Sequence, residues 1–407
     1  MRKILLISIL FAVYTVNSQT KKVLFLGNSY TYVNDLPSLI KNLAQADGKI
    51  LDYDQNTPGG YSLEGHSTNS TSLDKIASSN WDFVVLQDQS QKPSFPPSQV
   101  ETDVYPYAKI LVDSIYSNNE CTEPLFFMTW GRQNGDQDNC PYYTPLCTYE
   151  GMQERLRESY LEMGVDNMAS VSPVGMAWQK TREITGDTIN LYSSDESHPS
   201  IYGSYLAACV FYTSIFKASP INNTFISTLT DTTAHLLQQI AYSVVTDSNY
   251  IWNFNTANFG IYQNNNFNYS FTGTENYTTE TWYFGDGVVE TTHNPEHTYQ
   301  NSGQYTVTHI STGDCYTDTV TKTIQVTETT NSYNIDNTEI NIYPNPFKNI
   351  INIDAASVTK VTLFNNLSVK IIETSERNID VSSLKKGIYY IEILTKKGKT
   401  NRKLIKL

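Results

Sequence analysis

The chain has 407 residues, of which 39% are hydrophobic and 17% are charged, and its formal net charge is −13. This length exceeds that of one ordinary domain, so two or three domains are expected. The last 50 residues hold 11 Lys and Arg against 4 Asp and Glu, which leaves 17 against 37 upstream. The acidic body argues against nucleic acid or an anionic membrane surface as the main partner, and the basic tail is a separate compositional block.

The first 18 residues have the features of a secretory signal peptide. Two basic residues precede an apolar run from Ile4 to about Val16, and small and polar residues follow, with Ser18 as the expected last residue before cleavage. The apolar run is too short to span a bilayer comfortably, and no later stretch is long and apolar enough to do so. The sequence therefore predicts an exported protein without a membrane span after cleavage.

Residues 20–250 alternate between strand and helix signals. The segments "KKVLFLG", "WDFVVLQ" and "PLFFMTW" are short, unbroken apolar runs typical of buried strands. The segment "LPSLIKNLAQADG" spaces its apolar residues at helical intervals and ends in Gly48, a good stop signal. This alternation predicts an α/β domain in which helices cover both faces of a parallel sheet.

After about residue 250 the composition changes to that of small β domains. Residues 254–328 alternate apolar and polar positions around Gly-Asp-Gly and Asn-Ser-Gly turns, as antiparallel β-sandwiches do. Residues 329–338 are polar and predict a linker. Residues 339–407 again show short alternating strands, with Gly387 and Gly398 as turn points, and predict a second small β-sandwich.

The segment "FLGNSYT", residues 25–31, predicts an exposed serine at the end of the first strand. A strand that stops at Gly27-Asn28 and turns into a helix presents its next side chain, Ser29, at the carboxyl edge of the sheet. That edge is where open α/β sheets place their sites. Ser29 is therefore a candidate nucleophile, and a serine nucleophile needs a base and an orienting acid.

His198 is the preferred candidate base. It follows Asp195 by three residues in "SSDESHPS", a spacing that lets the carboxylate bind one ring nitrogen while the other nitrogen faces a serine. His66 is a less favoured alternative base. His235 lies in an amphipathic helical segment, where a structural role is expected.

Taken together, these motifs resemble those of the SGNH (GDSL-like) hydrolases over about residues 20–245. "FLGNSYT" is similar to the first block of that family, "TPGGYSLEGH" to the second and "SDESHP" to the last. The resemblance implies a flavodoxin-like three-layer sandwich, Ser29 as nucleophile, His198 as base and Asp195 as orienting acid. It also implies that the Ser29 and Gly60 backbone N–H groups form part of an oxyanion hole.

The third block departs from the family pattern. It normally reads G-x-N-D, with the asparagine side chain in the oxyanion hole, whereas this chain has "VVLQDQSQ". Gln87 replaces the glycine, and Gln89 aligns with the asparagine. A glutamine amide donates the same hydrogen bond from one methylene further, so Gln89 is the expected third donor. The alternative is that Gln89 only pins its loop.

Residues 254–328 resemble a PKD domain through "WYFGDG" and "HTYQNSGQYTV". Such modules serve as spacers or as weak glycan or protein binders, and the sequence does not decide between these roles. The C-terminal residues resemble the sorting domain of the type IX secretion system through "IYPNPF", "KKGIYY" and the basic closing segment. This resemblance implies an interaction with the type IX machinery and passage through the outer membrane, followed by release or surface attachment.

Cysteines and histidines outside the proposed site suggest one crosslink and no metal. Cys140 and Cys147 flank "PYYTPL" in a polar stretch and predict a loop-closing disulfide in an exported protein. His293 and His297 have i,i+4 spacing, but they lie in a β-type turn around Asn294-Pro295, so zinc is not expected. No cofactor is expected for the predicted chemistry.

The sequence thus predicts a secreted or surface-attached serine esterase whose substrate is a small ester or an acylated glycan. A carbohydrate esterase that removes acetyl or similar groups is the leading interpretation. A lipolytic esterase or thioesterase is the first alternative, although no apolar lid segment is evident. The second alternative is an inactive glycan-binding protein on the same fold, which only Gln87 and Gln89 favour.

Overall fold

The computed structural model describes residues 19–246, 251–252, 254, 259–264, 267–273, 278–313, 315, 317–327, 340–355, 357–365, 370–382, 384, 386–395 and 398–407. The predicted signal peptide and the predicted linker lie outside these residues. The chain divides into two compact units, Met1–Phe254 and Asn255–Leu407.

The first unit contains five strands and ten α-helices within its described residues. The strands are β1 (Thr20–Leu26), β2 (Ile50–Asn56), β3 (Phe83–Leu86), β4 (Glu123–Phe127) and β5 (Ser170–Ser172). The helices are α1 (Ser29–Tyr32), α2 (Leu36–Ala46), α3 (Leu63–Thr68), α4 (Ser70–Ala77), α5 (Pro97–Asp103), α6 (Tyr105–Asn118), α7 (Tyr149–Asp166), α8 (Val174–Thr185), α9 (Ile201–Phe216) and α10 (Asp231–Thr246).

The five strands form one parallel sheet in the order β2-β1-β3-β4-β5. This is the order of a flavodoxin-like doubly wound sheet. In register, Leu26 at the end of β1 lies opposite Leu86 of β3, which in turn lies opposite Phe126 of β4. The predicted α/β fold is therefore confirmed, and the carboxyl ends of the three central strands meet at one edge.

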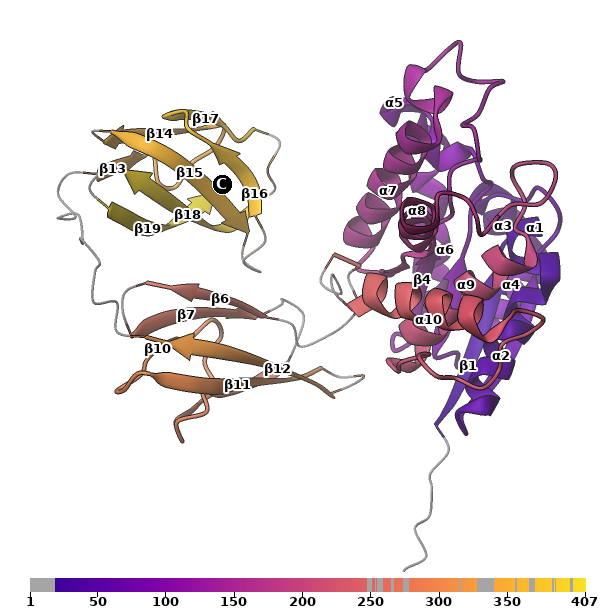
Figure 1. The fold of residues 1–407 in the computed structure, drawn as a ribbon, viewed down its shortest axis with the longest axis horizontal. Coiled ribbons are helices and arrows are strands. Elements are labelled where there is room, and N and C mark those ends of the chain that lie inside the picture. The colour runs from indigo at the N-terminus through magenta and orange to yellow at the C-terminus, as the bar shows by residue number, and fades with distance from the viewer. Residues whose placement is uncertain are drawn as a thin grey trace, which may run out of the picture. The chain divides into compact units, whose positions relative to one another are not determined.

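Helices cover both faces of this sheet, as the unbroken apolar strands require. Helices α2, α8 and α10 pack against α9, and Figure 1 shows α9 and α10 side by side in front of the sheet. Helices α3, α4 and α5 pack against α6. Helix α9 is apolar all round, and 14 of its residues are buried, as expected for a helix enclosed between a sheet and other helices.

The second unit consists of antiparallel strands in two groups. The first group is β6 (Phe259–Gln263), β7 (Asn268–Gly273), β8 (Thr279–Tyr283), β9 (Val289–Glu290), β10 (Glu296–Thr298), β11 (Gly303–Thr312) and β12 (Thr317–Val326). The second is β13 (Ile340–Tyr343), β14 (Ile350–Ala355), β15 (Val358–Asn365), β16 (Lys370–Thr374), β17 (Asn378–Asp380), β18 (Gly387–Thr395) and β19 (Gly398–Lys406).

Each group folds into two small sheets around its own core, which confirms the predicted all-β architecture. The first group forms sheets β10-β7-β6 and β12-β11-β8-β9, with Trp282 and Phe271 fully buried between them. The second forms β13-β14-β17 and β16-β15-β18-β19 around Ile351 and Ile391. His293 and His297 contact different carboxylates, those of Glu280 and Asp286 respectively.

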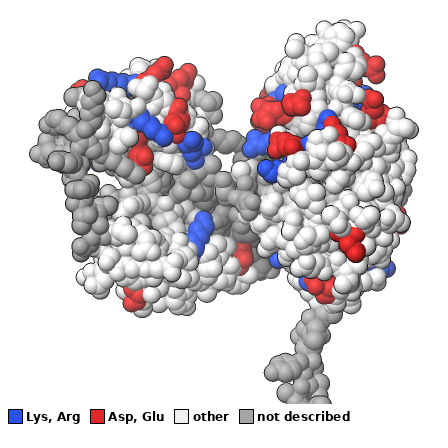
Figure 2. Space-filling model, in the orientation of Figure 1, with Lys and Arg blue, Asp and Glu red and all other residues white. Residues whose placement is uncertain are grey.

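Two further features concern the distribution of surface charge and the presence of membrane-spanning helices. On the face drawn in Figure 2, acidic side chains of the first unit are scattered and interspersed with Lys and Arg. In the part of the chain that the structure describes, no helix is both long enough and apolar enough to cross a bilayer.

Candidate active site

Ser29 is placed by a sharp exit from β1. Gly27 follows the strand, and a side chain there would lie only 2.5 Å from Thr31 Oγ1 and 2.6 Å from Gln87 Oε1. Asn28 then caps α1, because its Oδ1 accepts the Tyr30 N–H at 3.1 Å. Ser29 is thus the first residue of a short helix at the carboxyl edge of the sheet.

His198 and Asp195 reach Ser29 from the turn before α9. His198 Nε2 lies 2.8 Å from Ser29 Oγ, and His198 Nδ1 pairs with Asp195 Oδ2. The other oxygen of Asp195 accepts the backbone N–H groups of Ser197 at 3.1 Å and His198 at 2.9 Å. Partial burial opposes ionisation of Asp195, but the bonds from His198 and these N–H groups outweigh it and lower the pKa of Asp195.

The three predicted residues are thus brought together in the order that acyl transfer requires. The turn that carries Asp195 and His198 is closed by the Ser193 N–H, which donates to the His198 carbonyl at 2.8 Å. Glu196 has a positive φ of 61°, so the chain reverses between the acid and the base. The D-x-x-H spacing therefore corresponds to a compact turn in which one carboxylate binds both the backbone and the ring.

An aromatic stack packs against this turn, and no motif in the sequence predicts it. Trp130 stacks on Trp178 at 3.9 Å and on Tyr30 at 4.5 Å between ring centres, and the Tyr30 ring meets His198 edge-on at 5.5 Å. The Tyr30 hydroxyl lies 2.7 Å from Ser197 Oγ, and Trp130 Nε1 donates to the Ser197 carbonyl at 3.0 Å. These contacts fix the position of His198 without touching its ring nitrogens.

The backbone donors expected on the oxyanion side are available in the structure. Ser29 N–H is the first N–H of a helix and has no partner inside it. Gly60 has a positive φ of 71°, and its N–H makes no hydrogen bond among the described residues. Asn28 Nδ2 donates to the Tyr61 carbonyl at 2.7 Å and so ties the Gly60 loop to the cap of α1.

Gln87, which replaces the family's glycine, is a buried brace. Its Oε1 accepts the Asn28 N–H and the Thr31 hydroxyl, each at 2.9 Å. Its Nε2 donates to Asn28 Oδ1 at 2.7 Å. The glutamine side chain thus binds both the backbone and the side chain of Asn28 and fixes the cap of α1.

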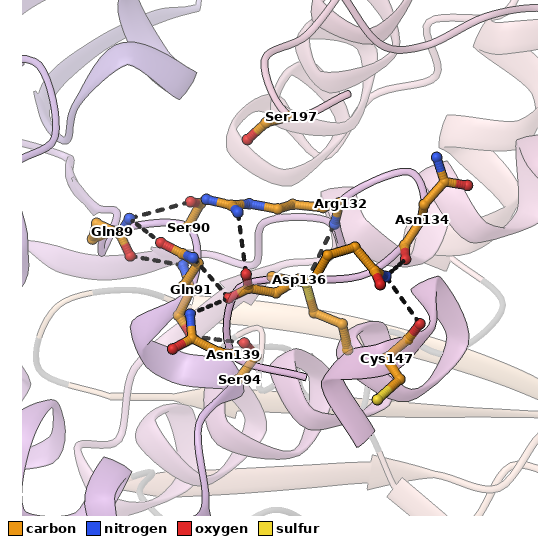
Figure 3. Close-up of polar contacts among 12 residues, drawn as sticks. Gln89, Ser90, Gln91, Ser94, Arg132, Asn134, Asp136, Asn139, Cys147 and Ser197 are labelled. Carbon is orange, nitrogen blue, oxygen red and sulfur yellow. Dashed lines mark hydrogen bonds and ion pairs between the residues drawn. The ribbon is translucent and has the colours of Figure 1, made fainter. Parts of the chain in front are cut away.

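Gln89 is engaged within its own loop, as Figure 3 shows. Its Nε2 donates to Gln91 Oε1 at 2.9 Å and lies 3.4 Å from Ser90 Oγ, and its Oε1 accepts the Gln91 N–H at 2.8 Å. In this arrangement its amide hydrogens are directed to Ser90 and Gln91.

His66, the alternative base, has a structural role. It is buried, its Nε2 lies 2.9 Å from the Gly27 carbonyl, and its Nδ1 lies 2.8 Å from Ser72 Oγ. Burial lowers the pKa of His66, and the bond to Gly27 offsets this only in part. Both ring nitrogens contact groups other than Ser29, so His66 supports the strand end rather than the serine.

Asp88 is a buried carboxyl in the third motif that binds the backbone of the second. Its Oδ1 accepts the Leu63 N–H at 3.1 Å and the Gln89 N–H at 2.7 Å. Its Oδ2 is buried without a partner among the described residues. Burial raises the pKa of Asp88 to about 6, against the lowering effect of these two N–H groups.

Cys140 and Cys147 form the expected disulfide, with 4.6 Å between their Cα atoms. The bridge closes part of the long connection between β4 and α7. The backbone of this connection contacts the turn that carries Asp195 and His198 (the catalytic turn), because the Gln133 N–H donates to the Glu196 carbonyl at 2.9 Å.

Comparisons with known proteins identify both β domains. Residues 255–328 match the family model of the PKD domain, and residues 341–407 match that of the secretion system C-terminal sorting domain. The chain carries a PKD domain and a sorting domain. The sorting domain marks it as a protein exported by type IX secretion to the cell surface or the extracellular space. No curated protein matches the chain.

Some of the similar solved structures cover about half of this chain, and others cover a PKD domain alone. A DUF4886 family protein from Bacteroides uniformis is 18% identical, with 56% of this chain and 96% of that chain covered and a TM-score of 0.48. A candidate SGNH hydrolase from Slackia heliotrinireducens is 24% identical, with 48% and 98% covered and a TM-score of 0.40. The PKD1 domain of Vibrio anguillarum Epp is 31% identical, with 17% and 90% covered and a TM-score of 0.16.

Proposed function

We propose that residues 20–250 form a secreted serine esterase of the SGNH type. The observation that carries this proposal is the continuous chain of contacts from Ser29 Oγ to His198 Nε2, and from His198 Nδ1 to Asp195. A hydroxyl in contact with an imidazole, which is itself oriented by a carboxylate, is the arrangement that activates a serine for acyl transfer. The available N–H groups of Ser29 and Gly60 add the charge stabilisation that this chemistry requires.

The proposed reaction has two steps. Ser29 Oγ attacks the ester carbonyl while His198 Nε2 takes its proton, and the negative charge develops on the carbonyl oxygen near the two N–H groups. The ester C–O bond then breaks, and His198 returns the proton to the leaving alcohol. In the second step water attacks the acyl-serine with the same base, and the released acid restores Ser29.

In this proposal Gln89 is the third oxyanion donor. Its side chain stands at the carboxyl edge of β3, next to β1 in the sheet. To donate to an oxyanion, its Nε2 has to exchange the bonds to Gln91 and Ser90 for one to the substrate. That exchange is open to direct kinetic test, which is described below.

The proposed substrate class is acylated carbohydrate, with removal of acetyl or similar small acyl groups. Export and the attached PKD domain support this choice by association rather than by chemistry. The lipolytic alternative predicts that activity rises with acyl chain length, whereas a carbohydrate acetylesterase prefers two-carbon acyl groups.

Labelling with a fluorophosphonate tests the hydrolase proposal, because this probe reacts with activated serines. We expect labelling of the wild-type protein and none of Ser29→Ala, together with turnover of p-nitrophenyl acetate above that of longer-chain esters. Folded wild-type protein that takes up no label and cleaves no ester would overturn the hydrolase proposal and favour the inactive alternative. Labelling that persists in Ser29→Ala would overturn the assignment of the nucleophile.

A further inference from the structure

Arg132 lies at the same sheet edge as the proposed catalytic residues but has no part in the triad. It follows β4 by five residues, and β4 is the neighbour of β3 in the sheet. Its side chain is 25% exposed, so part of the guanidinium is accessible to solvent. Arg132 therefore lies where a bound substrate could contact it.

Most of the hydrogen-bonding capacity of Arg132 is unused. Its Nη1 donates to Asp136 Oδ1 at 3.2 Å. Its Nε is buried without a partner, and its Nη2 makes no hydrogen bond among the described residues. Nη2 is not among the fully buried atoms, so it is the donor that a ligand can reach. A hydrogen bond from this charged group to an acceptor on a ligand would be favourable.

Asp136 holds the guanidinium in place. It is fully buried, and its Oδ2 accepts the Gln91 and Asn139 side-chain amides, each at 2.7 Å. This leaves Oδ1 to contact Arg132 through one nitrogen only. Figure 3 shows the guanidinium above Asp136 and beside Ser90, so the arginine is oriented by a buried carboxylate that two side-chain amides hold in place.

The position of Arg132 is linked to the triad through Tyr30 and the catalytic turn. Burial raises the pKa of Tyr30, and the bonds to Ser197 and Ser90 and then the charge of Arg132 lower it. The residue after Arg132, Gln133, donates its N–H to the Glu196 carbonyl at 2.9 Å. The Tyr30 hydroxyl contacts Ser197, the residue before His198. The nearby acids are engaged elsewhere: Asp195 binds His198, and Glu196 Oε2 accepts the Asn134 amide at 2.8 Å.

We propose that Arg132 binds an anionic group, a carboxylate or a sulfate, on the ester substrate, so that the enzyme prefers acidic acylated glycans. A guanidinium binds such groups through charge-assisted N–H donors, and Nη2 is the donor of Arg132 that is neither buried nor bonded among the described residues. The inference rests on the proposed esterase function and deepens it by naming the substrate class.

Matched ester pairs test the proposal on the full chain. For the alcohol side the pair is 4-acetoxybenzoate and its neutral amide, 4-acetoxybenzamide. For the acyl side it is the mono-p-nitrophenyl ester of adipate and p-nitrophenyl hexanoate. Phenyl acetate carrying a 4-sulfate, compared with the carboxylate, separates the two anion types. We expect wild-type kcat/KM to favour the anionic member of at least one pair by about 10- to 100-fold, the range for a charge-assisted hydrogen bond.

Arg132→Gln should reduce this ratio to near one, mainly through a higher KM for the anionic ester. Because the change also leaves Asp136 buried without its cation, the double variant Arg132→Gln/Asp136→Asn provides a neutral pair and should give the same ratio. Arg157→Gln, on α7 beside α8 and α10, changes the net charge equally and should keep the wild-type ratio.

The outcomes separate the two proposals. A wild-type ratio near one in every pair, or a high ratio that survives in both Arg132 variants, would overturn the role of Arg132 while leaving the esterase in place. Absence of turnover of every ester, with no fluorophosphonate label on Ser29, would instead overturn the proposed function itself.

Discussion

Gly27 determines whether the Ser29 hydroxyl can reach His198. A Cβ at this position would lie within 2.6 Å of both Thr31 Oγ1 and Gln87 Oε1, and Gln87 is fully buried. A shift of Gln87 would weaken its bond to the Asn28 N–H, and a shift of Thr31 would weaken its bond to Gln87. The glycine in "FLGNSYT" is therefore required by close packing rather than by a turn.

Gly27→Ala should fold less stably, by about 1–3 kcal/mol for overpacking, and should lose about 100-fold in kcat/KM because Ser29 shifts from its partner. Chemical denaturation and ester hydrolysis measure the two effects. Gly303→Ala is the control, because a Cβ there would meet only the Tyr305 ring, at 3.5 Å or more. Wild-type activity in folded Gly27→Ala would show that the close contact does not position the serine.

Asp88 should make the stability of the first domain depend on pH. Its pKa of about 6 in the folded state exceeds the value near 3.9 expected in the unfolded chain. Between these two values the folded state holds a proton that the unfolded state releases. The free energy of unfolding should therefore fall as pH rises from about 4 to about 6, by up to about 3 kcal/mol.

Asp88→Asn removes this titration, so its unfolding free energy should lack the Asp88 contribution to the slope in that window. Denaturant titrations at several pH values, on both proteins, measure the difference in slope. The absolute stability of the variant is not the readout, because an amide also places a new donor where Oδ2 has no partner among the described residues. Equal slopes in the two proteins would contradict the prediction.

The proposed oxyanion role of Gln89 can be separated from loop bracing. If its amide stabilises the oxyanion, Gln89→Ala should lower kcat by about 10²- to 10³-fold with little change in KM. Gln91→Ala, assayed with a neutral ester, is the loop control, because it removes the same loop contact from the other side and Arg132 has no anion to bind in that assay. A near wild-type kcat in Gln89→Ala, or an equal loss in Gln91→Ala, would assign Gln89 to the loop alone.

At the scale of elements, the sequence predicted the strongly apolar strands and helices but did not predict the half-exposed edge strand. The buried strands β1, β3 and β4 appear as unbroken apolar runs, and α2 shows a clear helical period. The edge strand β2, "ILDYDQN", pairs on one side only, and most of its side chains are at least partly exposed. Its polar composition therefore carries no strand signal, and its existence follows only from pairing with β1.

The residues of the site that lie in short sequence motifs were predictable. Those that come together only through tertiary packing were not. Ser29, Asp195 and His198 lie in short motifs whose spacing reflects the chemistry. The stack of Tyr30, Trp130 and Trp178 joins three distant segments, so no window of the sequence reveals it. The direction of the Gln89 amide likewise depends on Gln91, which only the folded loop places beside it.

The disulfide should stabilise the connection between β4 and α7. It closes a loop with a sequence separation of 7, for which the chain-entropy model gives about 2–3 kcal/mol. The double variant Cys140→Ser/Cys147→Ser should therefore unfold at lower denaturant concentration. A genetic change is preferable to a reductant because it leaves the other cysteines unaltered. Unchanged stability would show that the loop is held by its hydrogen bonds, such as those of Asp136, without the bridge.

At the scale of the whole molecule, the chain separates chemistry from export. The triad, its aromatic support and the oxyanion-side donors all lie before residue 205, within the first compact unit. The sorting domain begins at residue 341, has its own core and carries a basic composition unlike the acidic body. No residue proposed for catalysis comes from it.

A protein truncated after residue 335 should therefore hydrolyse esters in vitro with kcat/KM within about twofold of the full chain, yet should fail to reach the surface of its host. The physical reason is that the described core residues around the strands β1–β5 all lie before residue 255 in the chain, so the truncated protein keeps them. Purified truncated protein and fractionated cells of a producing strain provide the two measurements. Ser29→Ala in the full chain is the matched control, because it should be exported normally and be inactive. A truncated protein that is folded but inactive, or one that still appears outside the cell, would show that the two tasks are not divided in this way.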